Sequence, residues 1–159
     1  MSDGGSALQS EIKKRRPFET TEEELHLNLL RTADAVGGEF ARLFKEKGVS
    51  PPLYNVLRIL RGEGRPLPCL EVAGRMITRL PDITRLVDRL ETSGLVARSR
   101  TEEDRRVVLI SITDAGLSLL ATLDAPIAAL NKTRLGHLTP AEQAELNRLL
   151  VKARHPEFG

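Results

Sequence analysis

Cysteine, aromatic residues and long apolar runs are scarce in this chain. Its 159 residues include one cysteine, Cys69, and no tryptophan, and aromatic residues make up 3% of the total. A single cysteine cannot close an internal disulfide, which is typical of a reducing compartment. No apolar stretch approaches the ~20 residues that cross a bilayer, and residues 1–10 lack the features of a secretory signal. We therefore expect a soluble, cytoplasmic protein without membrane contact.

Residue patterns typical of enzymes and metal sites are missing as well. His26, His137 and His155 stand far apart and show no metal-ligand spacing. The chain has no recognisable nucleophile–base pair and no phosphate-cradling loop, and Gly62–Gly64 is interpreted as a turn. We therefore expect neither an enzyme nor a bound metal or other cofactor.

Lysine is absent between Gly48 and Asn131, although eleven arginines lie from Arg58 to Arg106. The planar guanidinium fork of arginine suits phosphates and guanine edges. A GC-rich genome that favours arginine codons explains the bias equally well, and the net charge of +2 is too small to decide. The charge distribution is therefore compatible with a nucleic-acid partner but does not require one.

The N-terminal part is predicted to be a disordered tail followed by a long helix. Residues 1–19 are rich in Ser and Gly, and their basic run Lys13–Arg16 is interpreted as solvated charge, with an arm touching DNA as the alternative. The helix is predicted to begin near Thr20 or Thr21, because Thr21 with Glu24 matches a capping box, and to end at Gly48. Its apolar residues recur every three or four positions, so one face is buried.

Two short helices joined by a tight connection are predicted next, the pattern of a helix-turn-helix. The first lies around Leu70–Met76 and the second spans Pro81–Leu90, after a preceding helix that begins at Ser50. In such motifs the second helix lies in the DNA major groove. Helical spacing turns one set of its residues inward, namely Ile83, Leu86, Val87 and Leu90, and the others outward, namely Pro81, Asp82, Thr84, Arg85, Asp88 and Arg89.

Several outward residues of this helix are candidates for DNA contacts. Thr84 and Arg85 lie near its start, where such helices meet base edges, and Arg85 can fork onto guanine. Asp82 either accepts from a cytosine amino group or stabilises the positive N-terminus of the helix. Arg79 is a candidate phosphate contact. Arg89 is a weaker candidate, with ion pairing inside the helix as the alternative.

The segments Leu95–Arg100 and Val107–Ile112 are short and rich in β-branched residues, which predicts a hairpin. Asp104, Arg105 and Arg106 lie at its polar tip. A salt bridge among them would hold one guanidinium ready for a narrow minor groove. The alternative is a solvated turn with surface ion pairs.

Two further helices are predicted to follow the hairpin. Thr113 caps the first, in which Pro126 is expected to introduce a kink, and Thr139 with Glu142 caps the second. These two helices and the first long helix carry apolar stripes that a small winged unit cannot cover. The simplest solution packs them against a second copy of the chain. Two recognition helices about 34–36 Å apart then meet successive major grooves.

The motif string Thr84–Glu91, Gly94–Val96, Asp104–Val107 and Thr113–Gly116 resembles the MarR family of bacterial transcription regulators. The resemblance extends over nearly the whole chain. It implies a dimer with a winged helix-turn-helix, usually a repressor whose DNA affinity falls when a small phenolic or other lipophilic ligand binds. The run Arg79–Asp82 departs from the small polar residues of many relatives, so base preferences cannot be transferred.

The resemblance also implies roles for individual residues. The second residue after the wing aspartate enters the minor groove, which assigns that role to Arg106, with Asp104 orienting it. The resemblance further places a ligand pocket between the first and second helices, near the dimer interface. The candidates there, for which a purely structural core role is the alternative, are His26, Phe40, Tyr54 and Arg58.

We therefore predict a mainly α protein with a small β-hairpin wing, a winged helix-turn-helix flanked by N- and C-terminal dimerisation helices. The expected parts are a tail (1–19), a dimerisation region (20–48 and 114–155) and a DNA-binding domain (49–113). The predicted function is a homodimeric repressor that binds a near-palindromic double-stranded operator and is released by a small molecule. The alternatives are a winged-helix module for protein contacts and a redox-responsive regulator that uses Cys69.

Overall fold

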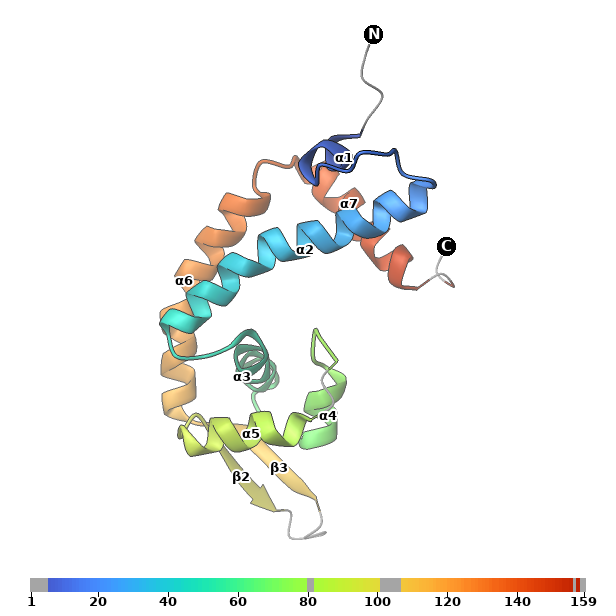
Figure 1. Cartoon of the computed structure of the whole chain (residues 1–159). Helices are drawn as coiled ribbons and strands as arrows, with labels where there is room; N and C mark the ends of the chain where they lie inside the picture. The colour runs from blue at the N-terminus through green and yellow to red at the C-terminus, as the bar shows by residue number, and fades with distance from the viewer. Residues whose placement is uncertain (1–5, 80–81, 101–106, 156, 158–159) are drawn as a thin grey trace. The chain divides into compact units, whose positions relative to one another are not determined.

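The computed structural model (Figure 1) describes residues 6–79, 82–100, 107–155 and 157. The chain divides into two compact units, Met1–Glu39 and Phe40–Gly159. The structure is mainly helical with one small antiparallel sheet, which confirms the predicted fold class.

The N-terminal unit contains a short helix, α1 (Ala7–Glu11), within the segment that was predicted to be disordered. Ser6 caps this helix by accepting a hydrogen bond from the Gln9 amide at 3.2 Å, and Leu8 is buried. Lys14 donates to the carbonyl of Pro17 at 3.0 Å, which fixes the following turn. The composition of this segment predicts disorder, but composition takes no account of the hydrogen bond by which Ser6 caps α1 or of the burial of Leu8.

The long helix α2 (Thr21–Glu46) begins where it was predicted to begin, but a different pair of residues caps it. The Glu23 amide donates to the Thr20 hydroxyl at 3.1 Å, and the Glu23 carboxylate accepts from the Glu19 amide at 2.9 Å. The predicted pair of Thr21 and Glu24 was therefore wrong by one residue.

The second unit holds the winged helix-turn-helix, whose sheet has the strands β1 (Leu67–Pro68), β2 (Val96–Arg100) and β3 (Val108–Ile112). In Figure 1, α5 (Ile83–Thr92) crosses one end of the hairpin of β2 and β3. The sheet has the order β1-β3-β2 with antiparallel pairing. The strand β1 was not predicted from the sequence, because a two-residue strand that contains a proline at the edge of a sheet leaves no alternating pattern. The other helices of the winged helix-turn-helix are α3 (Pro51–Glu63) and α4 (Cys69–Gly74).

Two helices complete the chain, α6 (Asp114–Leu135) and α7 (Pro140–Arg154). The α6 helix continues through Pro126 as one element. At its start, the Thr113 hydroxyl accepts from the Gly116 amide at 3.2 Å and donates to the carbonyl of Gly94 at 2.7 Å. The predicted capping box of α7, from Thr139 to Glu142, is confirmed.

The core of the second unit lies where α3, α5, α6 and the sheet meet. Val87 and Leu90 of α5 are 0% and 1% exposed, as their helical spacing predicted, and Ile83 and Leu86 pack against the same cluster. These contacts hold the polar face of α5 toward solvent. The fully buried leucines and isoleucine from the other elements are Leu57, Leu60, Leu67, Ile110, Leu120 and Leu123.

A buried asparagine on α3 supports the turn between α4 and α5. The side-chain oxygen of Asn55, which is 7% exposed, accepts a hydrogen bond from the Ile77 amide at 2.8 Å.

Asn55→Ala should lower the free energy of unfolding by about 1–2 kcal/mol, because the Ile77 amide then has no side-chain acceptor. Urea denaturation measures this, with Asn131→Ala, an exposed asparagine on α6, as the matched control. Equal stability of both variants would contradict the assigned role of Asn55.

Candidate nucleic-acid interface

The N-terminus of α5 is organised by Asp82. Its carboxylate accepts a hydrogen bond from the Arg85 amide at 3.0 Å and lies 3.9 Å from the Arg85 Nε. This is the N-cap position, where a carboxylate satisfies a free backbone amide and opposes the positive end of the helix. Asp82 therefore has the structural role that the sequence left open beside base recognition.

The outward face of α5 presents exposed polar groups. Thr84 and Arg85 are exposed, with 83% of the Arg85 side chain accessible. Arg89 is also exposed, and its guanidinium makes no ion pair with any described residue. Arg79, just before the helix, is exposed too. Thus the structure leaves these three guanidinium groups accessible to a partner.

Arg98 of β2 was not predicted from the sequence, and it is the most connected side chain at this interface. Its two terminal nitrogens donate to Asp88 at 2.5 Å and to Glu91 at 2.6 Å, and the nitrogen that meets Asp88 lies 3.5 Å from the carbonyl oxygen of Thr84. Arg98 thus pairs with the acidic residues of α5 that lie near Arg89, for which ion pairing inside the helix was the alternative to a DNA contact. Strand alternation provided one clue, because Arg98 shares a sheet face with the buried Val96.

The register of the wing is defined on both sides of its tip. Val96 pairs with Ile112 and Arg100 with Val108. Four predicted site residues lie outside the described residues, namely Pro81 before α5 and Asp104, Arg105 and Arg106 at the tip. Their proposed DNA contacts therefore rest on the sequence and on the placement of the strands beside them.

The structure brings together only part of the predicted ligand pocket. Phe40 and Tyr54 belong to one aromatic cluster, since Phe44 stacks on Tyr54 at 4.4 Å between ring centroids and lies 6.4 Å from Phe40. Arg58 is exposed on α3. His26 is exposed and belongs to the N-terminal unit.

Cys69 is half-buried at the start of α4, beside α5. Burial raises the pKa of its thiol, and this outweighs the opposite effects of the Arg98 charge and of a hydrogen bond with Thr84. A raised pKa keeps the thiol protonated at neutral pH, whereas the thiolate is the form that oxidants attack. The environment of Cys69 thus disfavours the redox-responsive alternative.

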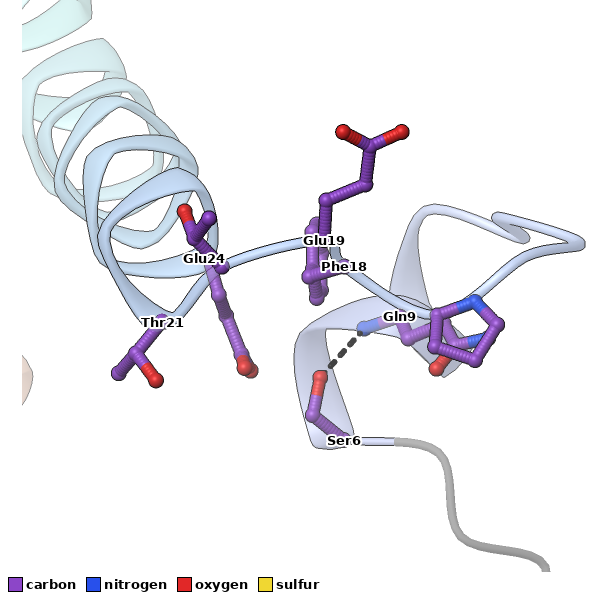
Figure 2. Close-up of a pocket in the computed structure, with 8 residues that line it drawn as sticks. Ser6, Gln9, Phe18, Glu19, Thr21 and Glu24 are labelled. Carbon is purple, nitrogen blue, oxygen red and sulfur yellow. Dashed lines mark hydrogen bonds between the residues drawn. The ribbon is translucent and has the colours of Figure 1, made fainter.

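The described residues were also compared with what a ligand pocket, a metal site and a membrane-spanning helix require. A polar hollow of about 260 Å³ lies in the N-terminal unit. Figure 2 shows residues that line it, among them Ser6, Gln9, Thr21 and Glu24. Its carboxylate and hydroxyl groups do not suit a lipophilic ligand. The part of the chain that the structure describes contains no group of residues that could hold a metal ion. Among the same residues, none of the helices has the length and apolar character needed to span a bilayer.

Comparison with known proteins relates this arrangement to a family. Residues 49–108 match the model described as the MarR family. The chain is 30% identical to the HTH-type transcriptional repressor MdtR of Bacillus subtilis (strain 168), over 81% of this chain and 83% of that protein. It is 41% identical to the crystal structure of a MarR transcription factor from Planctomyces limnophilus, which covers 84% of this chain and 97% of the other with a TM-score of 0.65.

A more distant structure shares the fold. Bordetella bronchiseptica BpsR, whose DNA binding is regulated by 6-hydroxynicotinic acid, is 24% identical and has a TM-score of 0.76 over 88% of this chain and 99% of that chain. Family model, sequence relatives and fold agree with the helix-turn-helix and wing described above. The chain belongs to the MarR family and is a transcription regulator rather than an enzyme.

Proposed function

We propose that this protein binds a specific double-stranded DNA site as a homodimer and represses transcription. The observation that carries the proposal is the face of α5, where Thr84, Arg85 and Arg89 are exposed while the opposite face is locked into the core. Such a helix fits a major groove, with guanidinium forks directed at guanine and phosphate. The proposal also has Arg106, which lies between the two wing strands in the sequence, enter the adjacent minor groove.

The helices outside the winged unit support the homodimer. Leu146, Leu149 and Val151 of α7 are 41%, 46% and 43% exposed. On α2, Leu25 and Leu30 are 55% and 56% exposed. Apolar residues repeated along one helix are covered in a stable protein, and a second copy of the chain is the simplest cover.

We propose that a small aromatic ligand releases the protein from DNA. The relative BpsR responds to 6-hydroxynicotinic acid, and the cluster of Phe40, Phe44 and Tyr54 offers aromatic surface on which a planar ring can stack. We propose a small lipophilic or phenolic ligand that binds beside this cluster and lowers DNA affinity.

Selection of duplexes from a random pool, followed by footprinting on the DNA that flanks its own gene, tests DNA binding directly. We expect a near-palindromic protected site and an affinity that falls steeply with salt.

Arg106→Ala should weaken binding to all sequences, and unchanged affinity would exclude the minor-groove role. Sedimentation equilibrium should give a dimer. A dimer that binds no duplex at low salt would instead favour the winged-helix module for protein contacts.

A further inference from the structure

Two carboxylates lie on the side of α5 that faces away from the core. Asp88 follows Arg85 by three residues, which places the two side chains about 60° apart around the helix axis. Glu91 lies one further turn along, next to Asp88. Carboxylates at such positions repel DNA phosphates and oppose the attraction of the exposed arginines.

Arg98 is placed to weaken this repulsion. Each of its terminal nitrogens meets a different carboxylate, at 2.5 Å for Asp88 and 2.6 Å for Glu91. Its side chain is 26% exposed, against 83% for Arg85, so Arg98 lies along the helix rather than reaching out into solvent. A guanidinium fork can serve two acceptors at once, which a lysine ammonium does less well.

We propose that Arg98 is a positioning residue for DNA binding, whose single positive charge offsets half of the negative charge of Asp88 and Glu91 and so weakens their repulsion of DNA phosphates. This inference rests on the proposed DNA-binding function. It assigns Arg98 a task distinct from that of Arg85 and Arg89, since Arg98 acts through the two carboxylates and contacts no DNA itself.

A purely structural role predicts different behaviour. Partly exposed ion pairs contribute little to folding stability because water screens them, so removal of Arg98 should change thermal unfolding only slightly. Repulsion between carboxylates and phosphates, however, acts whenever DNA approaches and weakens as salt rises. The binding defect should therefore shrink at higher salt, whereas a misfolded interface would not recover.

Arg61 provides a matched control. It forms a two-pronged ion pair with Asp124, at 2.8 and 2.9 Å, which links α3 to α6 and does not involve α5. Arg61→Gln and Arg98→Gln each remove one positive charge from the chain. Adding Asp124→Asn or Asp88→Asn to the respective variant restores the original net charge.

The experiment measures the affinity of all four variants and the unaltered protein for a labelled pool of random-sequence duplexes at two salt concentrations, with melting temperatures as the folding control. Arg98→Gln should weaken binding about tenfold at low salt, and Arg61→Gln by no more than about threefold. Adding Asp88→Asn to Arg98→Gln should recover most of the loss, and the defect of Arg98→Gln should diminish at the higher salt.

The possible failures are distinguishable. An unaltered protein that binds no duplex overturns the proposed function, and this inference with it. If the unaltered protein binds and Arg98→Gln binds equally well, only the role of Arg98 is overturned. A double variant that stays as weak as Arg98→Gln, with a normal melting temperature, also overturns the proposed charge offset.

Discussion

Gly116→Ala should lower the free energy of unfolding by about 2–4 kcal/mol, although alanine is the better helix former. Gly116 lies in the first turn of α6 and is buried. A Cβ there would overlap the carbonyl oxygen of Leu95 and approach the Ile112 side chain to 2.7 Å. The obstacle on one side is backbone, which cannot rotate away, so α6 and the wing would have to separate.

Gly62→Ala is the control for this prediction. Gly62 also lies inside a helix, α3, but an added Cβ there would meet nothing within 4 Å. That substitution should stabilise the protein by about 0.4–1 kcal/mol, because it restricts the unfolded chain. Urea denaturation of both variants measures the difference. If Gly116→Ala were as stable as Gly62→Ala, the close packing of α6 on Leu95 would be refuted.

Arg85→Ala should reduce the affinity for a selected operator by about 10- to 100-fold, since a two-pronged contact with guanine accounts for about 1–3 kcal/mol of discrimination. Affinity for random-sequence duplexes should fall much less, because Arg85 is one of several cations near the DNA. Titrations of labelled operator and random duplexes at the same salt concentration compare the two losses.

Arg85→Lys separates charge from geometry at the same position. It keeps the positive charge but loses the planar fork. We expect it to bind random duplexes normally and to lose preference at the guanine position. A uniform loss across all sequences in both variants would mean that Arg85 contacts phosphate instead of a base.

The inward side of α5 could be predicted from sequence because helical spacing depends only on neighbours in the chain. Val87 and Leu90 are buried as expected, and Arg85 is exposed. The capping pair of α2 was harder to choose. Thr20 and Thr21 each have a glutamate three residues later, so the local pattern fits either pair equally well.

The contacts of Arg98 could not be predicted in this way. Arg98 is separated in sequence from Asp88 by ten residues and from Glu91 by seven, and it lies on a strand whereas both carboxylates lie on a helix. Such a contact depends on how β2 packs on α5, and the spacing of apolar residues does not determine that packing. Strand alternation beginning at the buried Val96 indicates the face of the sheet but not the partner.

The hydrogen bonds of Thr113 have a mechanical consequence. Its amide donates to the carbonyl of Leu95 at 3.1 Å and its hydroxyl to that of Gly94, while the same hydroxyl caps α6. Gly94 and Leu95 directly follow α5, so the end of the recognition helix and the start of α6 are joined. The 22 residues of α6 form a lever about 33 Å long. A tilt of α6 is therefore transmitted through Thr113 to the segment that joins α5 to β2.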